Sequence, residues 1–360
     1  MHHASAACHL FGAALVAAVL ACAPATAQEP APAPADPFVR YEGKSGPLQG
    51  KKVLLVSGDE EYRSEESLPQ LGRQLSRLGA TCTVLFALER EGGTIDPNVR
   101  DEIAGLEMLA EADLLVLFVR LRDWPDEAMQ HIARYVEAGK PIVALRTSTH
   151  AFDLKKDSKF ERYGIRSSTW RGGFGREVLG ETWIDHHGGH GWQSTRGVMA
   201  PGADAHPILR GVDPKTVWDP SDVYTVRLPL PEGCTTLLFG EVLAGMKPDD
   251  PPAPPTKDEK SEKLIDLNAP MMPVAWTRSW KAPNGAVART FTTTLGAGEA
   301  FLHVGTRRLL VNACLWSLGL EAAITPELEV SLIGTYEPLP FGFNKHRRGV
   351  KPSDLAWPPR

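Results

Sequence analysis

Short apolar runs alternate with stretches of helical spacing in the first half of the chain. The apolar runs are residues 51–57, 81–87, 113–119 and 141–145. Each has the length and the continuous apolar character of a strand that is buried on both faces. Between the runs, apolar residues recur every three or four positions, and Gly79 and Gly139 follow two of these stretches as helix stops. Strands and helices in alternation predict right-handed β-α-β units, and therefore a parallel sheet with helices on both faces.

The pattern changes after His150. Residues 151–200 are rich in glycine, histidine, tryptophan and arginine, which predicts a long excursion over the edge of the sheet. Further strands are predicted at residues 223–230, 235–243, 274–280 and 287–295. The last two flank Asn284-Gly285, a strong hairpin signal, and residues 307–318 have the pattern of a final buried helix. The expected fold is an α/β parallel sheet to which an antiparallel hairpin region is added.

The N-terminus has the features of a secretory signal peptide. Residues 1–27 contain no Asp, Glu, Lys or Arg, and an apolar run at 10–22 precedes a small-x-small motif at 25–27. The run is shorter than the roughly 20 residues that a membrane-spanning helix needs. We therefore expect cleavage after Ala27 and an exported protein, periplasmic or extracellular, with no transmembrane segment after cleavage. A lipoprotein signal that retains Cys22 is the second alternative.

The remaining chain divides by composition into three parts. Residues 28–38 are a Pro/Ala-rich linker that cannot form a core. Residues 39–335 are long enough for one large α/β domain, and 336–360 are expected to form a C-terminal tail.

Charge and cysteine content exclude several classes of protein. The net charge of −5 gives no support for nucleic-acid binding, which needs a basic surface. Three cysteines follow the predicted cleavage site, namely Cys82, Cys234 and Cys314. Each lies in an apolar context and none belongs to a CxxC motif, so buried thiols are expected rather than disulfides or a nucleophile.

Polar residues follow three of the four predicted parallel strands. Ligands of open parallel sheets bind beyond the carboxyl ends of the strands. The residues at these ends are Asp59, Glu60, Arg63, Arg120, Arg146, Thr147 and His150. We expect Asp59 or Glu60 to act as a general base, His150 as a general acid or orienting group, and Arg146 as an anchor for oxyanion charge. Arg63, Arg120 and Thr147 are expected to bind substrate. The alternative is that these charges are structural ion pairs.

A histidine-rich loop at 185–191 is a candidate metal site. His186, His187 and His190 could offer imidazole nitrogens to zinc, and the glycines among them allow a tight loop. The spacing is not HExxH, so the alternative is a loop whose histidines bond to backbone or ligand.

Several stretches of this chain resemble the trehalose-utilisation, or ThuA-like, family. They are residues 53–64, 145–152, 180–191, 205–211, 273–277 and 289–296. The resemblance implies a flavodoxin-like sheet similar to that of the class I glutamine amidotransferases, and a link to sugar metabolism. Amidotransferases use a cysteine after the strand that here ends at Arg146-Thr147, so we expect no amidotransferase activity.

The residues and the resemblance together suggest a carbohydrate-active protein. We expect a small-molecule carbohydrate partner, a glucoside or disaccharide or a keto-sugar derived from one, with Trp183 or Trp192 stacking on a sugar ring. One alternative is a non-catalytic carbohydrate-binding or scaffold protein, because a fold does not fix a function. Another is a metal-dependent hydrolase. The oligomeric state is left open, with a homo-oligomer among the alternatives.

Overall fold

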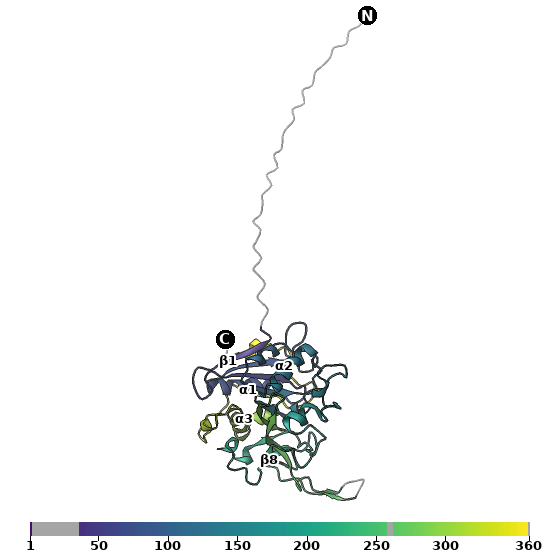
Figure 1. The fold of residues 1–360 in the computed structure, drawn as a ribbon, viewed down its shortest axis with the longest axis vertical. Coiled ribbons are helices and arrows are strands. Elements are labelled where there is room, and N and C mark those ends of the chain that lie inside the picture. Colours follow the sequence, from purple (N-terminus) through teal and green to yellow (C-terminus); the bar gives the residue numbers. More distant parts are fainter. Residues whose placement is uncertain (2–35, 258–261, 359–360) are drawn as a thin grey trace. The chain divides into compact units, whose positions relative to one another are not determined.

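A mixed β-sheet of ten strands forms the centre of the protein (Figure 1). The computed structural model describes Met1 and residues 36–257 and 262–358. Apart from Met1, the predicted signal peptide and residues 28–35 of the predicted linker lie outside the described residues. In chain order the strands are β1 (Phe38–Glu42), β2 (Lys52–Gly58), β3 (Thr81–Phe86), β4 (Leu114–Val119), β5 (Ile142–Leu145), β6 (Thr195–Met199), β7 (Trp218–Asp219), β8 (Cys234–Val242), β11 (Met272–Lys281) and β12 (Val287–Thr293). A separate two-stranded sheet pairs β9 (Thr256–Lys257) with β10 (Leu264–Ile265).

Five neighbouring strands of the large sheet are parallel. Their order is β3-β2-β4-β5-β12, so the four apolar runs of the first half pair as the sequence pattern predicts. Alternate residues of each strand face opposite sides. In β2, Val53 and Leu55 belong to one hydrophobic core, whereas Leu54 and Val56 belong to the other. Because both faces are covered, β2, β3, β4 and β5 need the continuous apolar sequence from which they were predicted.

The remaining strands extend the sheet in antiparallel fashion. The hairpin signal is confirmed, because β11 and β12 pair antiparallel on either side of Asn284-Gly285. Beyond β11 follow β8, β6 and β7, and on the opposite edge β1 pairs antiparallel with β3. The prediction of a strand at residues 223–230 is wrong, since this segment forms only an isolated bridge between Tyr224 and His186. Pro229 and Pro231, which lack backbone donors, limit pairing there.

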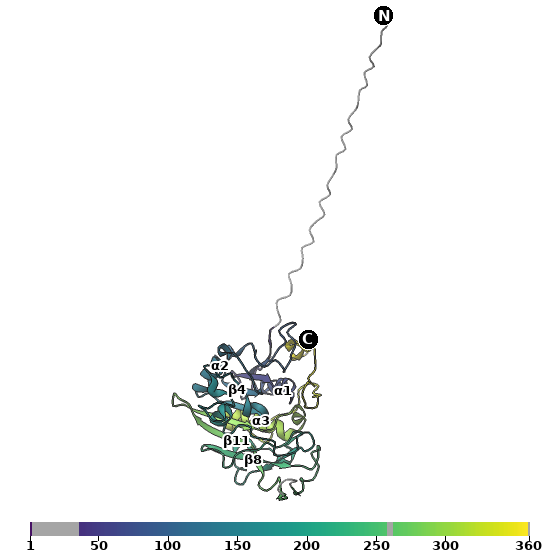
Figure 2. The same ribbon diagram turned by 90° about the vertical axis from the view of Figure 1, so that its right-hand side faces the viewer.

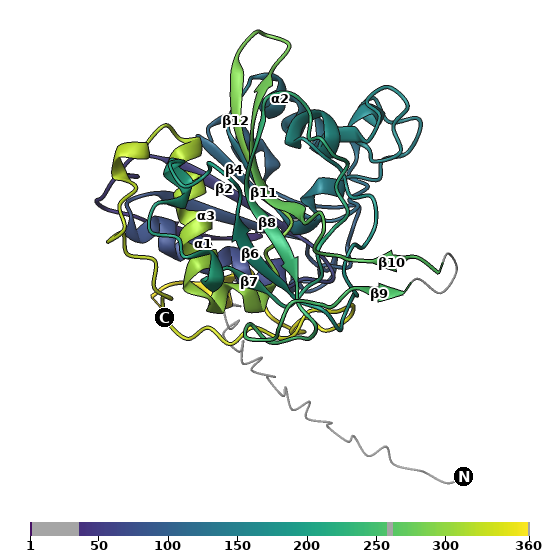
Figure 3. The same cartoon turned by 90° about the horizontal axis from the view of Figure 1, so that it is seen from below.

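Three α-helices cover the two faces of the sheet. They are α1 (Ser64–Arg77), α2 (Asp126–Glu137) and α3 (Val304–Ser317). Helices α1 and α3 pack with one core and α2 packs with the other, as Figure 2 and Figure 3 show. Leu68, Leu71 and Leu75 of α1 are fully buried at the predicted helical spacing. The fold is therefore a mixed α/β fold with a mostly parallel centre and an antiparallel extension, as expected.

Nine single-turn helices complete the described chain. They are the 3-10 helices η1 (Leu106–Ala110), η2 (Arg146–His150), η3 (Glu161–Tyr163), η5 (Pro207–Leu209), η6 (Pro214–Thr216), η7 (Gly298–Leu302), η8 (Glu321–Ala323) and η9 (Pro352–Leu355), and the π-helix η4 (Gly175–Leu179). The helical spacing between the apolar runs 81–87 and 113–119 thus yields only the short η1. Within the described ranges, no helix is long and apolar enough to cross a bilayer.

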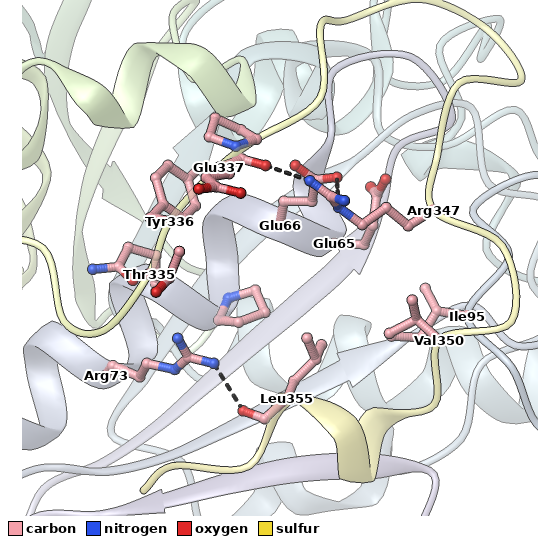
Figure 4. A pocket seen from close by; sticks show the side chains of 13 residues that line it. Glu65, Glu66, Arg73, Ile95, Thr335, Tyr336, Glu337, Arg347, Val350 and Leu355 are labelled. Carbon is pink, nitrogen blue, oxygen red and sulfur yellow. Dashed lines mark hydrogen bonds and ion pairs between the residues drawn. The ribbon is translucent and has the colours of Figure 1, made fainter. Parts of the chain in front are cut away.

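The C-terminal segment, residues 336–358, runs along α1 and encloses a small cavity with it. The cavity has a volume of about 260 Å³ and is lined by Glu65, Glu66 and Arg73 of α1 and by residues of the C-terminal segment (Figure 4). An ion pair at 3.5 Å joins Glu66 to Arg347 across it. The hydroxyl of Tyr41 in β1 also donates to the carbonyl oxygen of Leu355 at 2.9 Å. These contacts attach the segment to the α/β core.

Candidate functional site

A polar cavity lies beyond the carboxyl ends of the parallel strands. Strands β3 and β4 lie on opposite sides of β2, so the strand order reverses there, which is where open α/β sheets bind ligands. The cavity has a volume of about 400 Å³, within the range of small-molecule sites. The lining residues that bear on its chemistry are Glu61, Tyr62, Arg120, His150, Trp183, His186, His190 and Tyr224.

The histidine loop is held against this cavity by backbone pairing. His187 N–H donates to the carbonyl oxygen of Val223 at 2.8 Å, and Thr225 N–H donates to that of Asp185 at 2.8 Å. This short antiparallel ladder places His186 opposite Tyr224. It also brings Asp222, which no sequence pattern singled out, beside the histidines. The long excursion after β5 therefore returns to the strand ends.

Two histidines and two carboxylates form a connected network on one wall. His186 Nδ1 lies 2.7 Å from Oδ2 of Asp222, and His190 Nδ1 lies 3.1 Å from Oδ1 of the same carboxylate. On its other side, His190 Nε2 lies 3.1 Å from Oε1 of Glu61. Asp222 has no exposed side-chain surface, whereas the two histidines are partly exposed to the cavity. Asp222 is thus the buried centre of the network.

Arg146 supports Asp222 from beneath the cavity. Its Nη1 donates to the carbonyl oxygens of Asp222 and Thr294 at 2.8 and 2.7 Å, and its Nη2 donates to Oδ1 of Asp222 at 3.1 Å. The guanidinium lies between the rings of Tyr62 and Tyr224, 4.4 and 3.9 Å from their centroids. Arg146 adopts φ of 41°, a left-handed conformation that turns the chain from β5 into η2. The structure therefore places Arg146 behind the cavity wall rather than in it.

Asp59 and Thr147 are also buried below the wall. The Asp59 carboxylate accepts backbone N–H groups of Glu61 and Tyr62 and the hydroxyl of Thr147. Burial and then the charge of Glu60 raise the pKa of Asp59. These bonds shape the turn after β2 and link it to η2. Asp59 is not among the lining residues, and this turn presents Glu61 to the cavity instead.

Glu60 is engaged in ion pairs with two arginines. Its Oε1 lies 2.6 Å from Nη1 of Arg120, and its Oε2 accepts from Arg122, which is fully buried. Arg120 remains at the cavity, with its Nε 3.7 Å from Oε2 of Glu61. The pairing of Glu60 with Arg120 is the structural ion pair that the sequence left as an alternative.

His150 lines the cavity close to two aromatic side chains. Its ring centroid lies 5.5 Å from that of Trp183 and 6.1 Å from that of Tyr224. Burial lowers the pKa of His150 well below its ordinary value, and the positive charges of Arg120 and Arg146 lower it further. The ring is therefore neutral near pH 7 and offers one donor and one acceptor nitrogen. Nδ1 lies 3.3 Å from the hydroxyl of Thr149.

Three other candidates lie outside the cavity. His187 Nε2 lies 2.7 Å from the carbonyl oxygen of Leu267, away from the other two histidines. Arg63 is fully buried and donates to the carbonyl oxygens of Glu60 and Gly342, which attaches the C-terminal segment. Trp192 is 61% exposed and packs on the backbone of the histidine loop, whereas Trp183 lines the cavity.

The electrostatics of the network favour a positive charge on His190 and a negative charge on Asp222. Hydrogen bonds to Asp222, and then to Glu61, raise the pKa of His190 to about 9. Burial alone would raise the pKa of Asp222, but hydrogen bonds from His186 and His190 and the charge of Arg146 outweigh burial and lower it. His190, which lies between the carboxylates of Asp222 and Glu61, therefore keeps a proton near neutral pH.

The fold and this cavity define an α/β protein with a polar site at the carboxyl edge of its parallel strands. The chain belongs to the ThuA family, described as trehalose utilisation, whose family model matches residues 52–317, more than half of the chain.

Two solved structures of ThuA-like proteins are similar to this chain. One, from Parabacteroides merdae ATCC 43184, is 17% identical, with a TM-score of 0.42 and coverage of 81% of this chain and 97% of that one. The other, from Bacteroides uniformis ATCC 8492, is 15% identical, with a TM-score of 0.44 and coverage of 83% of this chain and 100% of that one. Comparison with curated proteins finds no match.

Proposed function

We propose that this protein binds a neutral sugar, a glucoside or disaccharide or a keto derivative of one, in the cavity at the strand ends and acts on it there. The observation that carries the proposal is the composition of the cavity wall. Trp183, His186, His190 and Glu61 line a space of about 400 Å³. The buried Asp222 lies behind the two histidines and bonds to both. An aromatic face beside convergent polar groups suits a pyranose, which has apolar ring faces and a rim of hydroxyls. The family description, trehalose utilisation, agrees with this substrate class.

Recognition would involve the part of the wall outside the network. The half-buried indole of Trp183 offers a stacking surface. Arg120 can donate to sugar oxygens, and its guanidinium is already oriented by Glu60 and Glu61. The neutral ring of His150 can donate to one hydroxyl and accept from another. These three residues would fix the sugar against the opposite wall.

The reactive wall would be the network centred on Asp222. Its groups are rigidly supported, because Arg146 holds Asp222 and the backbone ladder holds His186. Such support keeps reacting groups within the small positional tolerance that catalysis needs. Asp59, Thr147 and Arg146 then act as positioning residues, a role that their buried hydrogen bonds support. This assigns the carboxylate at the cavity to Glu61 rather than to its neighbours Asp59 and Glu60.

Sugar binding is tested by calorimetry and thermal shift with trehalose, other disaccharides, simple glucosides and their keto derivatives. Trp183→Ala should weaken binding by roughly two- to tenfold, since a stacking contact is worth about 0.5–1.5 kcal/mol. Trp192→Ala is the matched control and should bind like wild type. Failure of every sugar to bind, or equal losses in both variants, would remove the proposal.

Catalysis is tested separately on any sugar that binds. Wild-type protein should convert the bound sugar to a product that chromatography or mass spectrometry resolves. Glu61→Gln should bind the sugar and convert it far more slowly, because the variant keeps the shape of the side chain and loses its charge. If wild type binds a sugar and forms no product, the alternative of a non-catalytic carbohydrate-binding protein replaces the enzyme.

We also propose that the sheet is flavodoxin-like and that the protein is exported. The order β3-β2-β4-β5-β12 of the parallel strands supports the first, because in chain order it corresponds to the 2-1-3-4-5 arrangement of flavodoxin. The uncharged apolar N-terminus with its small-x-small motif at residues 25–27 supports the second.

A further inference from the structure

We propose that His186, His190 and Asp222 bind one divalent transition-metal ion of the zinc type. The three side chains offer one ligand atom each, and these atoms lie within 4.8 Å of one another. The set differs from the three histidines that the sequence indicated. His187 faces the carbonyl oxygen of Leu267, and Asp222 takes its place. The inference concerns the cavity of the proposed function and rests on that function for its catalytic meaning, but not for the binding itself.

The distances between ligand atoms are close to those of a metal site. In a tetrahedral zinc site with bonds of about 2.0–2.1 Å, neighbouring ligand atoms lie about 3.3 Å apart. Here His186 Nδ1 and His190 Nδ1 lie 2.7 and 3.1 Å from oxygens of Asp222. These two distances reach different oxygens of Asp222, and the three ligand atoms lie within 4.8 Å of one another. Side-chain rotations that move the ligand atoms by on the order of 1 Å would bring them to the spacing of a zinc site. Imidazole and carboxylate ligands suit zinc and its neighbours among the transition metals.

The surroundings of the three ligands are those of a supported metal site. A metal-binding histidine usually donates its second ring N–H to a carboxylate or carbonyl, which fixes the tautomer. Glu61 stands in this position, with its Oε1 3.1 Å from Nε2 of His190, and so leaves Nδ1 free to coordinate. Arg146 in turn donates to Asp222, the buried ligand. These two residues would orient the ligands without touching the ion.

The ligand count points to an open site. Three protein ligands leave a fourth position of a tetrahedral ion unoccupied, which is typical of catalytic rather than structural zinc. Because His186 and His190 line the cavity, that position would be accessible to water or to a sugar oxygen. Without an ion, the same space suits a proton on His190, held between Asp222 and Glu61. A metal and a proton are therefore the two competing occupants.

Elemental analysis of the full-length protein, purified without chelators, decides between them. We expect about one ion per chain in wild type and in the matched control His187→Ala, whose histidine belongs to the same loop and bonds only to backbone. His186→Ala and His190→Ala should lose the ion, and neither residue is buried, so both variants should fold. Calorimetric titration of chelator-treated protein with Zn²⁺ should give the same ranking. Glu61→Gln should weaken Zn²⁺ binding by about 10–100-fold.

Several results would overturn the metal site. One is that the wild-type protein contains no ion and takes up no Zn²⁺, Mn²⁺, Co²⁺ or Ni²⁺. Another is that the His190→Ala variant binds the ion as tightly as wild type does. Loss of the ion in His187→Ala alone would also contradict the assigned ligands. Sugar binding by chelator-treated protein separates this inference from the proposed function. Sugar binding without any metal uptake would reject the metal site alone, and metal uptake without sugar binding would reject the proposed function alone.

Discussion

Arg146 and Asp222 form an ion pair with no exposed surface, in which guanidinium Nη2 lies 3.1 Å from carboxylate Oδ1. The two residues come from different parts of the chain, since Arg146 begins η2 after β5 and Asp222 follows β7. The pair therefore joins the parallel core to the segment after β7, whose next residues pair with the histidine loop. Because Asp222 also bonds to His186 and His190, this contact supports the network together with the backbone ladder of the histidine loop.

Removing one partner of this pair should be strongly destabilising. We expect Arg146→Met to lower the free energy of unfolding by about 3–5 kcal/mol, because it removes the buried guanidinium from Asp222 and leaves two buried carbonyl oxygens without their donor. Urea denaturation with matched m-values measures this loss. Arg90→Ala, which removes an arginine that is 67% exposed and also ion-paired, is the control and should leave the denaturation midpoint almost unchanged. Equal effects of the two substitutions would show that the buried pair contributes no more than an exposed one.

The three cysteines that follow the predicted cleavage site should be structural and not reactive. All three are free thiols; Cys82 and Cys314 are buried and Cys234 is partly buried. Burial raises the pKa of each thiol, which suppresses the nucleophilic thiolate. Replacing Cys82 or Cys314 by Ala should cost between about 0.5 and 3 kcal/mol of stability without loss of sugar binding. A variant that folds normally but no longer binds or converts sugar would contradict this prediction.

Processing of the N-terminus should remove residues 1–27. Mass spectrometry of protein isolated from its native envelope should find Gln28 as the first residue. Cys22→Ala separates this cleavage from the lipoprotein alternative. If cleavage occurs after Ala27, the substitution should leave processing unchanged. A lipoprotein would instead lose the residue to which its lipid is attached. The lipoprotein alternative would be established if the wild-type chain began at a lipid-modified Cys22 and the Cys22→Ala variant accumulated unprocessed.

Four strands of the parallel core, β2 to β5, were predictable from sequence because each is buried on both faces. A strand in that environment requires an unbroken apolar run, such as Leu114–Val119. A run this short and this apolar fits no other secondary-structure element as well. The hairpin was predictable for a different reason, since Asn284-Gly285 suits the tight turn between its strands. The segment at 223–230 has a similar content of apolar residues but pairs with the histidine loop through only two backbone hydrogen bonds of Val223 and one of Thr225.

The site was predictable only as far as the strand ends. The sequence places Asp59, Glu60 and Glu61 together after β2, but it does not reveal which carboxylate points to the cavity. That depends on the turn, in which Asp59 accepts backbone N–H groups and so directs Glu61 outward. Asp222 could not be found by spacing, because its role arises from contacts with residues 32 and 36 positions away. Such contacts leave no periodic signal in a single sequence.

Glu65 should make the stability of the protein depend on pH. It lies in the first turn of α1, beside the cavity in Figure 4, and is only 6% exposed. Among the described residues, neither of its carboxylate oxygens has a hydrogen-bond partner, and Nη1 of Arg63 lies 3.6 Å away. Burial raises the pKa of Glu65 from 4.5 to about 8, although the charge of Arg63 opposes the rise.

The sign of the effect follows from proton binding. Between pH 4.5 and about 8 the folded protein keeps a proton on Glu65 that the unfolded chain has released. Stability should therefore fall as pH rises through this window, by up to about 1.4 kcal/mol per pH unit from this group. Glu65→Gln mimics the protonated form, so the variant should match wild type near pH 4.5 and exceed it at pH 8.

Urea denaturation of both proteins at pH 5, 6, 7 and 8 measures the difference, and other titrating groups cancel in it. Glu329→Gln provides a control in which the change of stability with pH should have the opposite sign. Hydrogen bonds from the backbone and side chain of Ser331 lower the pKa of Glu329, so this variant should lose stability relative to wild type at neutral pH and recover it in acid. Parallel curves for wild type and Glu65→Gln would mean that Glu65 is ionised in the folded protein, with a cation or water supplying the partner that its carboxylate otherwise lacks.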